Sequence, residues 1–334
     1  MLLKQSFPAH LDAVLDIVSS SLQHGVFPAC FKLADVTPVL KADKPRTALS
    51  SYRPVSNLPF LAKVLERIVV DRLQTHLDRY NLNETFQSAY KKKHSCESAL
   101  LRIQNDIATS LDENKCVMLA LIDLSAAFDT IDHAKLIHLL EHEYGVRGTA
   151  LHWFSSYLSE RYFQVKVGGI RSEPRQVTCG VPQGSVLGPI MFNLYIRPLC
   201  RVIENHNLHY HIYADDVQIY GSFFPTLADS TRVVSQFQEC LGQIRAWMLL
   251  SGLKINDLKT ELITFANPQQ VRLLPNLGLT SITFAGTTVN VSTAVRDLGA
   301  ILDCHLERDA HVSAVVKSCN FHLFQLFPCS SLYY

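Results

Sequence analysis

Apolar residues recur at helical spacing in several long segments of the chain. The run from Leu61 to Leu77 repeats every three or four positions, and this period predicts an amphipathic helix. Asn57 or Ser56 is expected to cap its N-terminus, because both residue types accept hydrogen bonds from the first free N–H groups of a helix. Further helices are predicted within the first forty residues, within 90–111, over 136–140 with Asp132 as the cap, over 149–160, around 190–195, over 233–248 with Gly252 as the stop, and at the start of the last twenty-five residues.

Strand-like patterns lie between these helices. "CVMLALID" (116–123) is a continuous apolar run that ends in an acid, which predicts a central strand buried on both faces. "FQVKV" (163–167) alternates apolar and polar residues and should turn at Gly168-Gly169. The other predicted strands are "ELITF" (261–265), "SITFAG" (281–286), "TVNV" (288–291) and "LGAIL" (298–302). Because strands and helices interleave without strict alternation, the pattern predicts an α+β fold.

Composition limits the size of the core and the kind of partner. The chain has 334 residues, 48% of them hydrophobic, enough for one large domain or two to three subdomains. The net charge is +1, so a nucleic-acid partner would have to be held by a local basic surface. The nine cysteines lack zinc-site spacing and are expected to be reduced core thiols. With neither a signal peptide nor a membrane span in the sequence, we expect a cytoplasmic or nuclear protein that is not secreted and contacts no membrane.

The stretch "HIYADDVQIY" (211–220) breaks the usual rule for strands, because it places two acids in the middle of an apolar run. The alternation of apolar residues slips by one position between Ala214 and Val217. A two-residue hairpin loop produces such a slip, so Asp215 and Asp216 should lie at or beside the tip of a tight hairpin. Asp-Asp suits such a turn poorly, and a broken local rule indicates a functional site.

A second acid, Asp123, follows the buried run in "LIDLSAAFD". The acids of the hairpin alone could simply be solvated. Carboxylates from two neighbouring strand ends, however, are the ligands that Mg²⁺ prefers. Two such ions about 3.5–4 Å apart can clamp the attacking and leaving oxygens of a phosphoryl transfer. Spacing alone leaves open whether Asp123 and Asp215 meet.

Several motifs, taken together and in order, resemble those of reverse transcriptases from non-LTR (LINE-type) retrotransposons. They are "YADD" in the hairpin, "LIDLSAAFDTIDH" before it, "GVPQGSVLGPIMFNLYI" between them, "VTPVLKADKP…SYRPVSNLPFLAKVLERIV" near the start, and "GLKINDLKTELITF" and "VRDLGAILD" after it. The resemblance covers roughly residues 25–320. It implies a right-hand polymerase with fingers, a palm built on a ferredoxin-like antiparallel sheet, and a truncated thumb.

By this resemblance, Asp123 and Asp215 are the main ligands of two Mg²⁺ ions, which Mn²⁺ could replace. Asp216 completes the acidic cluster, and the backbone carbonyl of Leu124 adds a further ligand. Lys259 matches a lysine that acts as general acid toward the leaving pyrophosphate, although a solvated strand-edge lysine is the plain alternative. For Asp129 and Asp132, helix-start caps are the alternative to a place in the cluster, and a cap is preferred for Asp132.

The resemblance also assigns substrate contacts. Phe128 matches an aromatic residue that lies beneath the incoming sugar and selects deoxynucleotides. Gln183 and Gly184 match a loop near the nucleotide and template. Lys41 and Arg53 match positions that grip the triphosphate, with Lys44 and Arg46 as alternatives. The run 91–94 (Lys-Lys-Lys-His) either holds template phosphates or is merely solvated.

The implied domains are fingers with an N-terminal extension (1–118), palm with part of the fingers inserted (119–304), and a thumb stub (305–334), with the reverse transcriptase domain at about 25–304 overall. Relative to a full element protein, the chain is expected to be truncated at both ends. The segment "FQSAYKKKHSCESAL" (86–100) departs from the Arg-Pro-Gly-like turn and the His-Ser-Thr of the family.

The implied function is that of an RNA-directed DNA polymerase that joins deoxynucleotides to a primer 3′-hydroxyl. Its partners would be an RNA template, a DNA primer and dNTPs, and a further partner encoded by the same element is left open. Two alternatives remain: an RNA-templated RNA polymerase, which Phe128 disfavours, and a catalytically silent retroelement remnant that at most binds nucleic acid.

Overall fold

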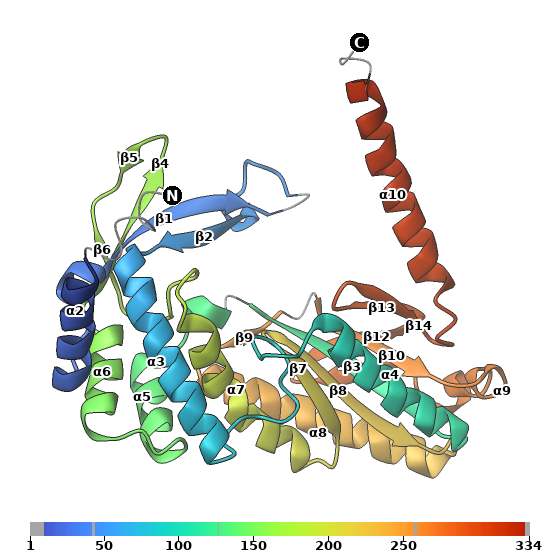
Figure 1. The fold of residues 1–334 in the computed structure, drawn as a ribbon. Coiled ribbons are helices and arrows are strands. Elements are labelled where there is room, and N and C mark those ends of the chain that lie inside the picture. The colour runs from blue at the N-terminus through green and yellow to red at the C-terminus, as the bar shows by residue number, and fades with distance from the viewer. Residues whose placement is uncertain (1–9, 42–43, 126, 257–258, 331–334) are drawn as a thin grey trace. The chain divides into compact units, whose positions relative to one another are not determined.

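The computed structural model describes residues 10–41, 44–125, 127–256 and 259–330, and it divides into two compact units (Figure 1). Each unit is assembled from separate stretches of the chain, so neither corresponds to a single continuous segment. The first unit comprises Met1–Thr85, Ala126–Pro198 and Met248–Lys254, and the second comprises Phe86–Ser125, Leu199–Trp247 and Ile255–Tyr334.

The first unit combines helices with a mixed sheet in the order β2-β1-β4-β5, with β6 also paired to β4. Its core contains an aromatic cluster in which Phe27 meets Tyr157 edge-to-face, with 5.0 Å between ring centroids. The elements are α2 (Leu11–His24), η2 (Ala29–Phe31), β1 (Leu33–Leu40), η3 (Leu49–Ser51), β2 (Tyr52–Asn57), α3 (Phe60–Arg79), η4 (Ala127–Asp129), α5 (His133–His142), α6 (Gly148–Leu158), β4 (Arg161–Val167), β5 (Ile170–Arg171), β6 (Arg175–Val177) and α7 (Gly188–Glu204), whose last residues enter the second unit.

The second unit is built on a mainly antiparallel sheet in the order β11-β12-β10-β3-β8-β7. A separate hairpin, β13-β14, accompanies it. The elements are α4 (Cys96–Asp112), β3 (Cys116–Ser125), β7 (His209–Tyr213), β8 (Asp216–Phe223), α8 (Leu227–Leu250), β9 (Lys254–Ile255), β10 (Glu261–Phe265), α9 (Pro268–Val271), η6 (Leu274–Leu277), β11 (Ser281–Phe284), β12 (Thr287–Ser292), β13 (Ala294–Asp297), β14 (Ala300–Asp303) and α10 (Asp309–Ser330). The last residues of α8 and the first residue of β9 belong to the first unit.

Strand β3 lies inside this sheet and is covered on both faces, as its continuous apolar run predicts. On one face, Leu119 packs with Ile103 of α4 in a single core cluster. On the other face, Met118 lies across from Gly221 of β8, and Phe237 of α8 lies against that glycine. Because side chains alternate along a strand, Leu121 and Asp123 face the α4 side together with Leu119. Asp123 of the buried strand therefore lies on the α4 face of the sheet.

The structure confirms the predicted α+β class and corrects details of the sequence analysis. Asp132 caps α5 as expected, with its Oδ1 accepting a hydrogen bond from the Lys135 N–H at 2.8 Å. Helix α3 begins later than expected: its N-cap is Pro59, and neither Asn57 nor Ser56 caps it. Those two residues instead end strand β2.

The sequence pattern did not predict strands β1 and β2. Their antiparallel register sets Pro38 opposite Pro54. Proline cannot donate to the ladder and argues against a strand when it is met in a sequence, which is why this hairpin gave no signal. At the other end of the chain, α10 continues to Ser330, further than predicted. Residues 331–334, the last part of the segment expected to be irregular, lie outside the described residues.

Composition predicted that the chain has no membrane span and that its cysteines are reduced core thiols. No helix among them is both long and apolar enough to cross a membrane. The cysteines described are all free thiols, as expected, but only Cys116, Cys200 and Cys240 are buried.

His211 in β7 is a buried titratable side chain in the second unit. Only 3% of it is exposed, and its Nε2 lies 2.9 Å from the Ser88 hydroxyl. Burial, followed by the nearby positive charge of Arg102, lowers the pKa of His211 from 6.5 to about 4. A depressed histidine pKa means that the unfolded chain binds the proton more tightly than the folded chain does.

Acidification should therefore reduce stability as the pH falls from about 6.5 toward about 4. His211→Gln should flatten this part of the pH dependence, by at most ~1.4 kcal/mol per pH unit. Denaturant unfolding of the parent and the variant between pH 7 and pH 4.5 measures the difference, with exposed His152→Gln as the control. Identical slopes for the parent and His211→Gln would contradict the assignment.

Candidate active site

The two acids of "YADD" lie at a tight hairpin, as the sequence predicted. Strands β7 and β8 pair so that Tyr213 is opposite Asp216, which leaves Ala214 and Asp215 as the two-residue turn. Ala214 has φ +57°, a left-handed conformation that glycine or asparagine adopts more easily. The turn therefore holds a strained alanine directly before its first acid.

The third acid joins this turn from strand β3. In the β3-β8 register, Asp123 is the direct cross-strand partner of Asp216. The backbone N–H of Leu124 donates to the Asp215 carbonyl at 3.3 Å, which ties the end of β3 to the turn. Side chains opposite one another on antiparallel strands point to the same face. The structure thus brings together residues that are far apart in the sequence.

Like charges crowd this end of the sheet. Burial, followed by the negative charges of Asp215, Asp123 and Asp297, raises the pKa of Asp216 to about 6, while Lys259 opposes the rise. A bound cation would oppose this shift, because positive charge beside a carboxyl group favours its ionised form.

Asp123 is held by two partners from the segment before β10. The ammonium of Lys259 lies 3.0 Å and 3.1 Å from its two carboxylate oxygens. The Asn256 side-chain amide donates to Asp123 Oδ2 at 3.1 Å, and the Asn256 N–H donates to the Asp123 carbonyl at 2.9 Å. Lys259 was predicted as a site residue and Asn256 was not, although both lie in the quoted motif "GLKINDLKTELITF".

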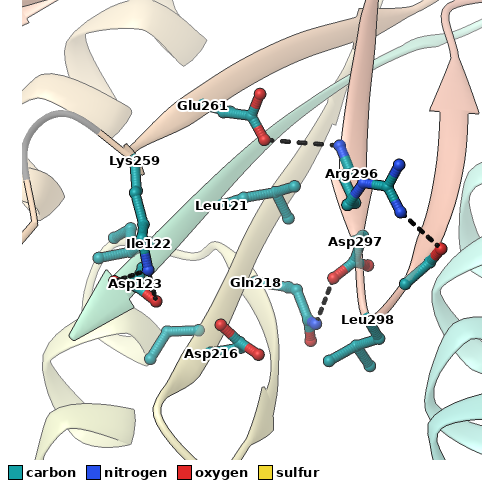
Figure 2. A pocket seen from close by; sticks show the side chains of 12 residues that line it. Leu121, Ile122, Asp123, Asp216, Gln218, Lys259, Glu261, Arg296, Asp297 and Leu298 are labelled. Atoms are coloured by element: carbon teal, nitrogen blue, oxygen red, sulfur yellow. Dashed lines mark hydrogen bonds and ion pairs between the residues drawn. The ribbon is translucent and has the colours of Figure 1, made fainter. Parts of the chain in front are cut away.

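Asp123, Asp216 and Lys259 line a cavity of about 480 Å³ in the second unit. Figure 2 shows Lys259 reaching Asp123 on one side and Gln218 meeting Asp297 on the other. The Gln218 Nε2 donates to Asp297 Oδ1 at 2.7 Å, and burial raises the pKa of Asp297 to about 6. Gln218 lies two positions after Asp216 on the same face of β8, so the β13-β14 hairpin is tied next to the acids.

The acidic residues suit divalent cations by their chemistry. Carboxylate oxygens are the ligands that hard cations prefer, and the pKa of Asp216 is raised by its burial and then by the neighbouring carboxylates. Among the described residues, no group of three or more His, Cys, Asp and Glu side chains is already arranged to hold a metal ion. Asp123 faces Lys259 and Asn256 instead.

Two of the predicted substrate-binding residues lie close together in the first unit. The Phe128 ring stacks on Phe192 with 4.9 Å between centroids, and its carbonyl accepts from the Val181 N–H at 2.8 Å. The Gln183 Nε2 donates to both carboxylate oxygens of Asp129 at 2.8 Å. Asp129 is thus the partner of the loop glutamine.

The loop around Gly184 is pressed against strand β2 by backbone contacts. The Ser56 N–H donates to the Gln183 carbonyl at 2.7 Å. Gly184 has φ +114°, and a Cβ there would lie 2.6 Å from the Ser56 carbonyl oxygen, closer than side chains allow. Ser56, Asp129 and Gln183 also line a cavity of about 310 Å³. The glycine thus permits a close approach to this protein's own strand β2.

A buried acid that the sequence analysis missed supports the same loop. Glu66 of α3 is fully buried, and its Oε2 accepts from the N–H groups of Val186 and Leu187 at 2.5 and 3.3 Å. The Tyr157 hydroxyl donates to its Oε1 at 3.1 Å. These amides directly precede α7, so the carboxylate acts at a helix N-terminus, where negative charge is stabilised.

The predicted phosphate-gripping residues lie on the β1-β2 hairpin. The Lys41 N–H donates to the Ser51 carbonyl at 2.8 Å and its ammonium donates to the Ser50 carbonyl at 2.9 Å. Arg53 is exposed in β2 and pairs with Val39. Lys41 and Arg53 therefore share one face of the hairpin.

The alternatives Lys44 and Arg46 lie in the loop of that hairpin and are exposed. The basic run 91–94 belongs to the second unit and precedes α4. Its lysines at 92 and 93 are exposed.

The model of one protein family, described as reverse transcriptase (RNA-dependent DNA polymerase), matches residues 39–299. The chain belongs to the reverse transcriptase family. The matched range includes Asp123, Asp215, Asp216 and Lys259. This confirms the resemblance that the motifs carried.

Several relatives of this chain are proteins of mobile elements. The RNA-directed DNA polymerase from mobile element jockey of Drosophila melanogaster is 28% identical over 307 residues, covering 90% of this chain and 32% of that protein. A probable RNA-directed DNA polymerase from transposon BS of the same organism is 28% identical, covering 93% and 34%. The chain thus spans about a third of the length of the curated relatives it matches.

Solved structures agree with the predicted polymerase fold. Apo telomerase from Candida tropicalis superposes with a TM-score of 0.54 at 12% identity, covering 88% of this chain and 52% of that one. A form of it truncated from the C-terminal domain gives 0.53 at 11% identity, covering 86% and 58%. At this identity the likeness concerns the fold.

Gly184→Ala should destabilise the reverse transcriptase by about 1–3 kcal/mol, because it adds backbone strain and a clash with the Ser56 carbonyl. Gly169→Ala is the matched control: Gly169 has φ +86° but open space around a Cβ, so only strain applies there. Urea unfolding compares the two variants, and an equal loss of stability in both would show that the contact with Ser56 is unimportant.

Proposed function

We propose that this chain is an RNA-directed DNA polymerase domain of retrotransposon origin. The observation that carries the proposal is the pairing of Asp123 with Asp216 across β3 and β8, with Asp215 in the adjoining turn. The reaction would be in-line attack of a primer 3′-hydroxyl on the α-phosphorus of a dNTP, with pyrophosphate leaving. Membership of the reverse transcriptase family supports this reaction.

Asp123, Asp215 and Asp216, with the Leu124 carbonyl, are the residues that would hold divalent metal ions, and Mg²⁺ is the natural choice for an all-oxygen set. When bound, such ions lower the charge repulsion on the transferring phosphoryl group. The carboxylates would set the position of these ions. Asp123 and Asp216 are fixed by the pairing of β3 with β8, and Asp215 lies in the adjoining turn, so little reorganisation is needed during the reaction.

Lys259 is proposed as the general acid. Its ammonium is next to Asp123 and can carry the proton that a leaving pyrophosphate requires. In the first unit, Lys41 and Arg53 are proposed to bind the triphosphate, and Phe128 to select the sugar. These roles rest on the motif positions that the residues share with the family.

Gln183 and Gly184 are proposed to contact the nucleotide and template from their loop. The bond from Gln183 to Asp129 would hold the glutamine side chain in a defined orientation. The basic run 91–94 is proposed to bind template phosphates without sequence preference. An RNA template and a DNA primer are accordingly the proposed partners, in the cytoplasm or nucleus.

The predicted division into fingers (1–118), palm (119–304) and thumb stub (305–334) is kept as a proposal. The sheet of the second unit, which presents the acids, would form the palm. The β1-β2 hairpin, which carries Lys41 and Arg53, would belong to the fingers.

A second candidate function is that of a silent remnant that binds nucleic acid without catalysis. It is favoured by the side chains around Asp123, which is engaged by Lys259 and Asn256, and by the lack of a ready metal-binding group among the described residues.

Primer extension on poly(rA)/oligo(dT) with Mg²⁺ or Mn²⁺ separates the two functions. The parent should extend the primer, and Asp215→Ala/Asp216→Ala should lower the rate at least about a hundredfold, because the carboxylates that would hold the metal ions are lost. The doubly substituted Asp12→Ala/Asp16→Ala changes net charge equally at two exposed positions of α2 and should retain activity. A folded parent that extends no primer would support the remnant instead.

Sugar selection provides a separate test. Phe128→Val should raise the use of ribonucleotides relative to deoxynucleotides by about tenfold or more, because a smaller side chain leaves room for a 2′-hydroxyl. Exposed Phe60→Val is the control. Competitive incorporation of dTTP and UTP measures the ratio, and an unchanged ratio would remove Phe128 from the proposed role. A parent that prefers UTP would indicate an RNA polymerase.

A further inference from the structure

The segment 86–89, at the start of the stretch that departs from the family pattern, lies alongside the strand that leads into the acidic turn. The Ile212 N–H of β7 donates to the Phe86 carbonyl at 2.8 Å, and the Ser88 N–H donates to the Ile212 carbonyl at 3.0 Å. These two bonds form a parallel bridge between Gln87 and Ile212. The Ser88 hydroxyl also lies 2.9 Å from His211 Nε2. The segment is therefore a short additional edge to the sheet, next to the turn.

The side chain of Gln87 extends from this edge to the turn itself. Its Oε1 accepts from the Ala214 N–H at 3.3 Å and from the Ala89 N–H at 2.8 Å. Ala214 is the turn residue with φ +57°. Left-handed alanine is higher in energy than its ordinary conformations, so a hydrogen bond to its N–H helps to hold the conformation in which the chain enters Asp215.

Gln87 is a polar side chain in a buried position, and this burial costs stability. Only 1% of Gln87 is exposed, and its Nε2 has no hydrogen-bond partner among the described residues. A buried amide with an unpaired N–H is less stable than an apolar side chain of the same shape. The hydrogen bonds from the Ala89 and Ala214 N–H groups are what such an apolar side chain could not accept, and the second of them reaches the turn.

We propose that Gln87 is a positioning residue for the acidic turn: it fixes the backbone of Ala214 and thereby the placement of Asp215 and Asp216. In this role Gln87 acts through the backbone of the turn, which its side chain contacts at the Ala214 N–H. The inference rests on the proposed function in so far as these acids are taken to bind divalent cations.

The test measures Mn²⁺ affinity by electron paramagnetic resonance on the full chain, beside primer extension and thermal unfolding. Gln87→Met keeps the length of the side chain and removes the acceptor. It should weaken Mn²⁺ binding about tenfold, as loss of groups that orient metal ligands commonly does. Gln270→Met is the matched control, because Gln270 is another buried, hydrogen-bonded glutamine of the second unit, and it should leave Mn²⁺ affinity unchanged.

Rescue distinguishes positioning of the turn from general packing. Glycine adopts positive φ without strain, so Ala214→Gly in the Gln87→Met background should bring the affinity back to within about threefold of Ala214→Gly alone. A merely structural glutamine would give additive losses. If Gln87→Met fails to fold, Gln87→Asn, whose shorter amide falls short of Ala214, is measured in the same way.

The outcomes separate this inference from the proposed function. Unchanged Mn²⁺ affinity in a folded Gln87 variant, or additive losses with Ala214→Gly, would overturn the role of Gln87 even if the parent extends primers. Weakened affinity with rescue would support that role even if no protein extends a primer, in which case the polymerase proposal fails alone. A parent that neither binds Mn²⁺ nor extends primers would overturn both.

Discussion

The pairing of β3 with β8 is the constraint on which the rest of the second unit depends. Their register sets Asp123 opposite Asp216, and like charges opposite one another destabilise a sheet. The structure tolerates this because both strands are held by apolar contacts along their remaining length, on two faces of the sheet. Lys259 and Asn256 then supply positive charge and hydrogen bonds to Asp123. The apolar packing of β3 and β8 thus offsets the charge repulsion between Asp123 and Asp216 at the edge of the core.

In the first unit, too, a charged side chain is held by hydrogen bonds next to the proposed site. A buried carboxylate, Glu66, accepts the amides at the start of α7, and backbone bonding to Ser56 holds the preceding loop. Removing a buried acceptor of this kind leaves several donors unpaired at once. In both units, therefore, polar contacts hold parts of the proposed site in place: Glu66 does so from a buried position, whereas Lys259 reaches Asp123 from an exposed one.

Much of this arrangement could be predicted from the sequence, and the failures have physical reasons. The continuous apolar run of β3 and the parity slip at Ala214 predicted a buried strand and a hairpin, because both follow from local periodicity. The meeting of Asp123 with Asp216 did not follow, since register between distant strands leaves no local trace. Family resemblance supplied the expectation that Asp123, Asp215 and Asp216 act together, and in the β3-β8 register Asp123 lies opposite Asp216.

Other features gave either a misleading signal or none. The prolines of β1 and β2 concealed a hairpin, since proline usually argues against a strand. Gln87, Asn256 and Glu66 were missed because a polar residue shows its importance only through the distant groups it contacts. None of the three has a hydrophobic period or a charge pattern that marks it.

The interleaving of the two units along the chain also affects how the protein is made. Asp123 and its partner Asn256 are 133 positions apart, and β3 must pair with strands that follow it at long range on both sides. During synthesis, the apolar run 116–122 therefore emerges well before β8 and β10 exist to cover its edges. Long-range pairing of this kind slows folding and leaves strand edges open to aggregation. Such a domain should depend on chaperones during translation more than a helical protein of equal size would.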